Sequence, residues 1–140
     1  MPMQPIPTNT KRGGELFYPE LSFEMMGLCF SVHNEQGRFS REKQYGDGLE
    51  EKLKEARIPY SRELRIGDTN NTIDFLIDNK IALELKTKPF LLREDYEQIQ
   101  RYLQASGVKL GILINFRGTH VRSHRVVRID RSGRKPDSDS

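Results

Sequence analysis

Three charged residues interrupt two short apolar stretches in the segment TIDFLIDNKIALELKTKP, residues 72–89. Alternating apolar residues on both sides of residues 78–80 predict a β-hairpin with a three-residue turn. Directly opposite residues of a hairpin point to the same face, so the apolar side chains meet each other in one register only. That register places Asp74 opposite Glu84, and Lys86 projects from the same face as Glu84.

The apolar partners in this register are Ile77 with Ile81, Phe75 with Leu83, and Ile73 with Leu85. Opposed carboxylates destabilise a sheet, and a cation between them would reverse the sign of that interaction. Carboxylate oxygens beside an ammonium are typical of a site for a hard cation. An ordinary solvated strand face that carries a Glu–Lys pair is the alternative interpretation.

The periodicity of the remaining chain predicts a single α/β domain. Its mixed β-sheet is flanked by helices in the order α-α-β-β-β-α-β-β. We expect Ser40 to cap the second helix and Gly107 to end the third. The expected helices cover residues 20–33, 40–56 and 92–105, and the expected strands residues 58–66, 72–77, 81–86, 109–116 and 120–129. Residues 1–14 are interpreted as a flexible leader, 15–129 as the domain, and 130–140 as a polar tail.

Composition excludes several classes of protein. The single cysteine, Cys29, rules out an internal disulfide and a cysteine-based zinc cluster, and its helical spacing predicts a buried position. No run of apolar residues is long enough for a membrane span, and the first residues lack a signal-type apolar run. A cytoplasmic location is therefore expected.

Two helices supply further candidate polar groups. Glu42 lies on the apolar stripe of the second helix, three residues before Tyr45, and an inward carboxylate needs a partner. It could instead be a first-turn glutamate that interacts with the helix dipole. Gln98 and Tyr102 are four residues apart on the third helix and could donate to a phosphate or a bound water. A solvated glutamine and a tyrosine at the edge of the core are the alternatives.

Basic residues concentrate near the end of the chain. The stretch from Arg117 to Lys135 contains one acidic residue, Asp130, and the chain as a whole carries a net charge of +3. Such a stretch is compatible with phosphate contacts, although a solvated basic face has the same composition. The candidate nucleic-acid-binding residues are Arg117, Arg122, Arg125 and Arg128.

The motif of Asp74 followed by Glu84-Leu85-Lys86 resembles the D…(D/E)xK signature of the PD-(D/E)xK nuclease superfamily. Longer blocks resemble its GxxExxY family in the same order, over roughly residues 18–127. They are YPELSFEMMGLCFSVHNEQG, FSREKQYGDGLEEKL, IDFLIDNKIALELK and YEQIQRYLQASGVKLGILINF. Glu42 and Tyr45 match the E and the Y of the family name, while Phe39 stands where that name has Gly.

The resemblance implies a restriction-endonuclease-like core and Mg²⁺- or Mn²⁺-dependent hydrolysis of DNA phosphodiester bonds, in DNA repair or processing. Asp74, Glu84 and the Leu85 carbonyl would ligate the metal, with Glu42 bound directly or through water. Lys86 would orient the attacking water. The resemblance also implies that Gln98 and Tyr102 position phosphate or water, and it includes His33 in a block of unassigned role.

Other functions remain open at this point. A catalytically silent module that binds nucleic acid or a protein partner could keep the same fold. A hydrolase of small nucleotides would need a closed pocket, and the sequence lacks a Gly-rich phosphate loop. A duplex-cutting enzyme of this size would work as a homodimer or with a larger protein partner. We expect no membrane partner.

Overall fold

The computed structural model describes residues 11–12 and 15–130, so most of the predicted leader and tail lies outside the described residues. Its centre is a five-stranded sheet in the order β3-β4-β5-β6-β7. The strands are β3 (Tyr60–Arg65), β4 (Thr72–Ile77), β5 (Ile81–Lys86), β6 (Leu110–Asn115) and β7 (Arg122–Val127). Strands β5 and β6 are parallel and the other neighbours are antiparallel, which confirms the mixed sheet.

Three helices complete the domain: α1 (Pro19–Gln36), α2 (Glu42–Ala56) and α3 (Arg93–Ser106). Two short strands, β1 (Lys11–Arg12) and β2 (Glu15–Leu16), pair with each other. The order from α1 to β7 is the predicted α-α-β-β-β-α-β-β. No helix in the described part of the chain has both the length and the apolarity to cross a membrane.

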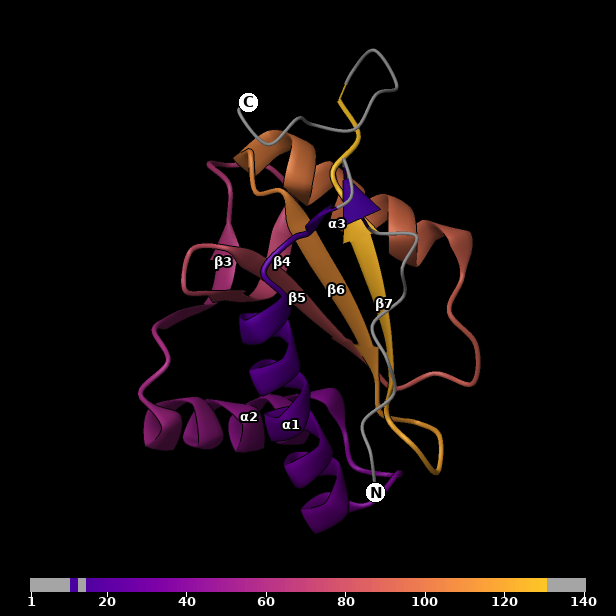
Figure 1. Ribbon diagram of the computed structural model, residues 1–140. Helices are drawn as coiled ribbons and strands as arrows, with labels where there is room; N and C mark the ends of the chain where they lie inside the picture. Colours follow the sequence, from indigo (N-terminus) through magenta and orange to yellow (C-terminus); the bar gives the residue numbers. More distant parts are fainter. Residues whose placement is uncertain (1–10, 13–14, 131–140) are drawn as a thin grey trace.

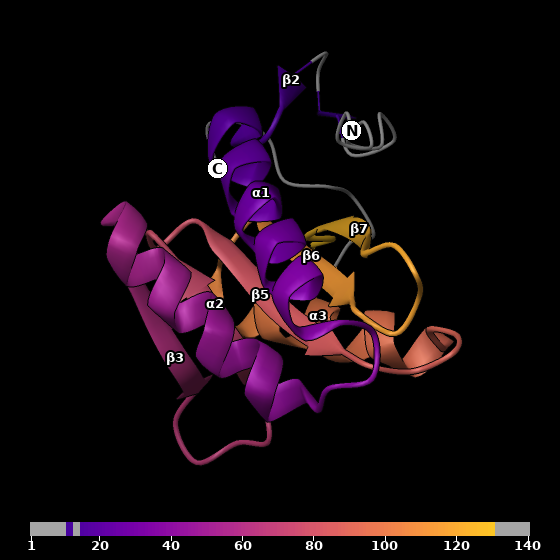
Figure 2. The same ribbon diagram turned by 90° about the horizontal axis from the view of Figure 1, so that it is seen from below.

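The helices cover both faces of the sheet (Figure 1 and Figure 2). Helices α1 and α2 pack on one face in a core that contains Cys29, Leu49 and Phe75, and Cys29 is fully buried as expected. Helix α3 packs on the other face through Ile99 and Leu103. Because the interior strand β6, between β5 and β7, is covered on both faces, all its residues are buried.

The β4–β5 hairpin has the predicted register over most of its length. Ile77 pairs with Ile81 and Phe75 with Leu83. The turn begins with Asp78 and Asn79 at φ 51° and 56°, and Asp and Asn tolerate this left-handed conformation better than most residues. The hydrophobic pattern therefore determines the register, as the sequence predicts.

Two local expectations are wrong. Ser40 does not cap α2, because the helix begins one residue later, and the Ser40 N–H instead donates to the Tyr45 hydroxyl (3.2 Å). Arg41 is the N-cap, and its N–H donates to the Gln44 side chain (2.9 Å). Gly107, in contrast, does end α3 with φ 81°.

The second error concerns Ile73, which we expected opposite Leu85. Ile73 packs with the α3 core, whereas Leu85 belongs to the core under α1 and α2. The strict alternation of β4 therefore fails between Ile73 and Phe75. Asp74 lies at the point of this change, and its surroundings form the candidate site.

Close packing of α3 on β6 gives a first prediction. A Cβ atom added at Gly111 would lie 2.7 Å from the Ile99 Cδ1 atom, and Ile99 is 1% exposed. We expect Gly111→Ala to lower the free energy of unfolding by about 1–3 kcal/mol, because overpacking strains both elements. Urea unfolding of the single mutants and of Gly111→Ala with Ile99→Val checks this. Ile99→Val should lower the free energy of unfolding less when Gly111→Ala is present than when it is made alone. Strictly additive losses of stability would contradict the packing argument.

Candidate functional site

The two hairpin carboxylates occupy the place where β4 and β5 separate. The paired register ends at Phe75 and Leu83, one residue before Asp74 and Glu84. The Asp74 N–H donates to Glu84 Oε1 (3.1 Å), and the Leu85 N–H donates to Asp74 Oδ2 (2.7 Å). Each carboxylate thus accepts a backbone amide of the opposite strand. This exchange satisfies two amide groups at the point where the strands separate.

The neighbouring strand β3 is distorted at the same level. Arg62 pairs with Phe75 and Leu64 pairs with Ile73, but Glu63 between them has φ 55°. Leu64 and Ile73 contribute to the α3 core, whereas Phe75 faces α2. A left-handed non-glycine residue costs of order 1 kcal/mol and changes the direction of the chain. Both strands therefore turn their side chains from one face to the other at this level.

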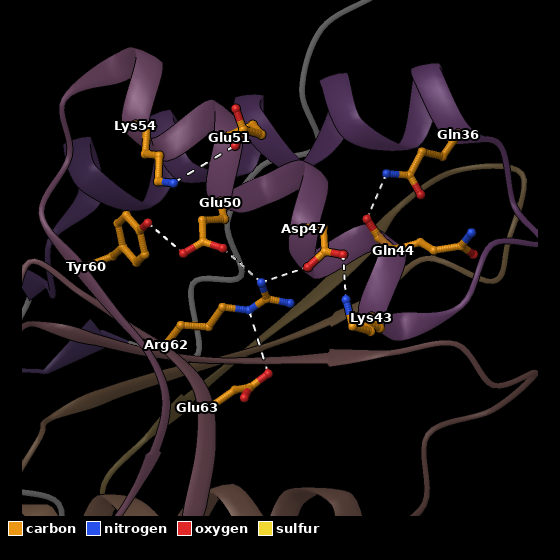
Figure 3. Close-up of polar contacts among 10 residues, drawn as sticks. All are labelled: Gln36, Lys43, Gln44, Asp47, Glu50, Glu51, Lys54, Tyr60, Arg62 and Glu63. Atoms are coloured by element: carbon orange, nitrogen blue, oxygen red, sulfur yellow. Dashed lines mark hydrogen bonds and ion pairs between the residues drawn. The ribbon is translucent and has the colours of Figure 1, made fainter.

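Arg62 joins this edge of the sheet to α2 (Figure 3). Its Nη1 donates to Asp47 Oδ1 (2.8 Å) and to Glu50 Oε1 (2.9 Å), and Glu50 also accepts from the Tyr60 hydroxyl (2.7 Å). The guanidinium lies 5.3 Å from the centre of the Phe75 ring. These contacts fix α2 over β3 and β4, and they bring the first turn of α2 close to Asp74.

A pocket of about 200 Å³ opens between α2 and the sheet. Its lining includes Glu42, Glu63, Asp74 and Leu85, which are three of the expected metal-site residues and one that the sequence did not indicate. Glu42 is exposed rather than buried as expected, because it is the first residue of α2 and lies beyond the packed stripe. Its Oε2 accepts a hydrogen bond from the Thr87 hydroxyl (3.3 Å).

The electrostatics of the pair oppose its ionisation. Burial and the neighbouring charge of Asp74 raise the pKa of Glu84 to about 7. Burial also raises the pKa of Asp74, and the charges of Glu42 and Glu63 add to that effect. A cation between the two carboxylates would offset this repulsion and would therefore favour the charged form of each.

Lys86 is held beside the pair by a second acidic group. Its Nζ atom lies 3.6 Å from Glu84 Oε2 and 3.6 Å from Asp95 Oδ1, and its side chain is 14% exposed. Asp95 is buried and also accepts from Lys88 Nζ (2.9 Å) and from the Leu92 N–H (2.7 Å). Burial opposes the charge of Asp95, but these donors and the charge of Lys86 outweigh it and lower the pKa. Asp95 thus keeps Lys86 directed along the edge of the site.

The carboxylates have the chemistry of a hard-cation site without its full geometry. The Glu84 Oε2 and Asp74 Oδ1 atoms accept no backbone amide, so each carboxylate keeps one oxygen available. Oxygen ligands of this type suit Mg²⁺ or Mn²⁺. Among the described residues, however, no three His, Cys, Asp or Glu side chains converge closely enough to hold a metal ion. Asp74 and Glu84 fit such an ion as a pair, and Glu42 would have to approach them.

The two candidates on α3 lie on the opposite face from α2. Tyr102 is buried in the α3 core, where burial raises its pKa, and Gln98 is half-buried. Neither side chain makes a hydrogen bond within the described residues. Their proposed roles toward phosphate or water therefore stay predictions.

Tyr45 and His33 support loops. The Tyr45 ring stacks on Phe116 with centroids 4.2 Å apart, and its hydroxyl donates to the Gly37 carbonyl. His33 Nε2 lies 3.1 Å from the Phe116 carbonyl and 3.0 Å from the Gly118 carbonyl. Since both partners are acceptors, Nε2 carries the proton. These contacts give His33 a structural explanation.

The four candidate arginines do not share one surface. Arg122 is exposed at the level of Lys86, because Lys86 pairs with Asn115 and Asn115 pairs with Arg122 across the sheet. Arg128 lies at the other end of β7 and donates to the Gly107 carbonyl. Arg125 is 8% exposed, and its guanidinium donates to Ser22 Oγ (2.7 Å) and to the Phe17 carbonyl (2.5 Å). This placement favours a structural role for Arg125 over contact with phosphate.

Sequence reasoning missed Glu63, Asp95 and Asn115. The Asn115 side chain accepts from the Lys88 and Arg117 amides and donates to the Lys88 carbonyl, so it joins the loops after β5 and β6. For Asn115 the available signal was its position as a polar residue at the end of the apolar strand that neighbours Glu84 and Lys86. For Asp95 the signal was an acidic residue in the first turn of α3, and for Glu63 the pattern offered none.

Comparison with known proteins identifies a family. A sequence model of the PD-(D/E)XK nuclease superfamily matches residues 19–129. Two solved structures align with part of the chain. SSO0001 is 20% identical with a TM-score of 0.46, over 79% of this chain and 57% of its own. The alkaline exonuclease LHK-Exo from Laribacter hongkongensis is 13% identical with a TM-score of 0.42, over 76% of this chain and 69% of its own. No curated protein matches significantly.

The raised pKa of Glu84 predicts a pH-dependent stability in EDTA. The folded protein binds the proton more tightly than the unfolded chain, whose glutamate titrates near 4.5. Stability is therefore fully present below pH 4.5 and decreases until about pH 7, by on the order of 1–3 kcal/mol. Urea unfolding at several pH values should show this slope in the parent and in Glu94→Gln, which changes an exposed glutamate. Glu84→Gln should flatten it, and a persisting slope would assign the titration to another group.

Proposed function

Since the chain belongs to the PD-(D/E)XK nuclease superfamily, we propose that it is a metal-dependent nuclease that hydrolyses DNA phosphodiester bonds. The observation that carries this proposal is the Asp74–Glu84 pair, in which Glu84 is buried and Asp74 half-buried. Each carboxylate accepts a backbone amide of the opposite strand, and the two charges repel each other in the absence of a cation. A purely structural role would not require two mutually repelling carboxylates at one position of a hairpin.

Each residue has a role in this proposal. Asp74, Glu84 and the Leu85 carbonyl would hold Mg²⁺ or Mn²⁺, with Glu42 bound directly or through water. When bound, the cation supplies charge neutralisation at the phosphate and lowers the pKa of water. Lys86 lies 3.6 Å from Glu84 and from Asp95, where it would orient the attacking water and stabilise negative charge on the phosphate oxygens.

The bond changes follow those of ordinary hydrolysis. The water oxygen forms a bond to phosphorus, the bond from phosphorus to the leaving sugar oxygen breaks, and that oxygen takes a proton. Gln98 and Tyr102 would position phosphate or water from the α3 side. Exposed Arg122 lies at the level of Lys86 in the sheet, where it would contact the nucleic-acid backbone.

A catalytically silent nucleic-acid-binding module is the second candidate. It is favoured by the failure of Glu42 to converge with Asp74 and Glu84 among the described residues. The two functions differ in turnover. A nuclease hydrolyses its substrate only when the carboxylates close around a cation. A silent module binds nucleic acid equally well with and without the cation.

Substitution of Lys86 distinguishes catalysis from binding. We expect Lys86→Ala to lower kcat with Mg²⁺ or Mn²⁺ by about 10²-fold or more, because it removes a donor aimed at developing charge. Metal binding measured by calorimetry should be nearly unchanged, since a charged lysine is no metal ligand. The matched control is Lys80→Ala, which removes an exposed turn lysine and should keep full activity.

The assay uses single-stranded, duplex and branched DNA with Mg²⁺, Mn²⁺, Ca²⁺ or EDTA. Hydrolysis that continues in excess EDTA would disprove the metal-dependent mechanism. Binding of DNA without hydrolysis under every metal condition would favour the silent module. Simultaneous loss of metal binding and activity in Lys86→Ala would assign Lys86 a structural role.

The arginines allow a test of the binding surface. Arg122→Ala should reduce the salt slope of DNA binding by about one unit and leave the melting temperature unchanged. Arg125→Ala should instead lower the free energy of unfolding by about 1–3 kcal/mol, because Ser22 and the Phe17 carbonyl lose their donor. If Arg125→Ala reduces the salt slope of DNA binding and leaves the free energy of unfolding unchanged, Arg125 belongs to the binding surface after all.

A further inference from the structure

An exposed phenylalanine lies on the loop that leads into the candidate site. Phe39 is located between α1 and α2 and is 74% exposed. Figure 2 shows that this loop, the β6–β7 loop and the β5–α3 loop gather on the same side of the molecule. Exposure of a large aromatic ring to water is unfavourable in free energy, so an exposed ring beside a candidate site is a candidate contact surface.

Two guanidinium groups lie within cation–π distance of the Phe39 ring. The Cζ atoms of Arg38 and Arg117 lie 5.0 Å and 5.5 Å from its centre. Arg38 Nε also donates to the Arg117 carbonyl (3.0 Å), so the two loops are joined at this point. Among the described residues, no carboxylate lies within 4.0 Å of either guanidinium. The positive charges beside the ring are therefore available for a negatively charged ligand.

The backbone on both sides of this platform, defined as Arg38, Phe39 and Arg117, is fixed. The Tyr45 hydroxyl holds the Gly37 carbonyl and the Ser40 N–H, which bracket Arg38 and Phe39. On the other loop, His33 holds the carbonyls of Phe116 and Gly118, which bracket Arg117. Preorganised backbone lowers the entropic cost of binding at an exposed side chain.

The platform is close to the pocket along the chain. Glu42 follows Phe39 by three residues, a distance of at most about 11 Å of extended backbone. Glu42 lines the pocket together with Asp74. A ligand on the Phe39 ring therefore lies within a few nucleotides of a phosphate at the carboxylates.

We propose that the Arg38–Phe39–Arg117 platform stacks an unpaired nucleobase of the substrate strand, so the preferred substrate is single-stranded or has an unpaired end. Aromatic rings with adjacent arginines bind single strands because every base offers a π face and every nucleotide a phosphate. Bases of a closed duplex are stacked on each other and cannot reach the ring. This inference rests on the proposed nuclease function and specifies its substrate.

The test measures fluorescence anisotropy in Ca²⁺ with a labelled single strand and with a blunt hairpin duplex. We expect Phe39→Ala to weaken single-strand binding by about 5- to 150-fold, the range that corresponds to one stacked base, and to leave duplex binding unchanged. Phe39→Trp should retain binding, because it keeps an aromatic face. The matched control is Phe23→Ala, which removes a 60% exposed phenylalanine from α1. Melting temperatures should be equal for all variants.

A scan with single abasic nucleotides locates the stacked base. At one position the abasic strand should bind the parent as weakly as the intact strand binds Phe39→Ala. When the same abasic strand is combined with Phe39→Ala, the two losses of affinity should not add. The same scan on RNA of equal sequence shows whether the platform accepts either sugar. Equal weakening of single-strand and duplex binding, or additive losses at every position, would overturn the stacking role.

Failure of this inference differs from failure of the proposed function. If the parent binds and hydrolyses DNA while Phe39→Ala behaves like Phe23→Ala, only the stacking platform is disproved. If the parent neither binds nor hydrolyses any nucleic acid under every metal condition, the nuclease function fails and the platform with it.

Discussion

The site depends on two hydrogen bonds, in which the Asp74 and Glu84 carboxylates each accept a backbone amide of the opposite strand. Asp74 and Glu84 each replace a carbonyl acceptor of the neighbouring strand, so β4 and β5 separate without leaving these two amides unsatisfied. The same hydrogen bonds hold two like charges together in a largely buried position. Structure and reactivity are therefore coupled here, because any ligand that draws the carboxylates away must compensate both amides.

The lysines and arginines of the domain divide into those that hold the fold and those that face the site. Arg62 and Arg125 each join a helix to the sheet through buried or partly buried acceptors. Lys86 is different, because its two carboxylate neighbours lie 3.6 Å away, beyond the range of a strong hydrogen bond. A lysine held by charge alone can move toward a phosphate without breaking a short contact.

The hairpin register, the helices and the position of Glu84 beside Lys86 were predictable, because the periods of two and of 3.6 residues determine which side chains share a face. The change of face at Asp74 was not, since it coincides with the left-handed backbone of Glu63 in a different strand, which the pattern did not indicate. Asp95 was visible as an acidic residue in the first turn of α3, but its partner was not. Its contact with Lys86 joins a helix to a strand across a loop, and no sequence spacing encodes it.

Glu63 also carries a consequence for evolution and design. Glycine adopts a left-handed conformation without steric cost, so replacement of Glu63 by glycine would relieve local strain. A search for more thermostable variants would therefore favour loss of this pocket carboxylate, although it adds to the negative field around Asp74. This position places conformational stability and the electrostatics of the pocket in direct competition, a trade-off that is common where a backbone is strained at a functional site.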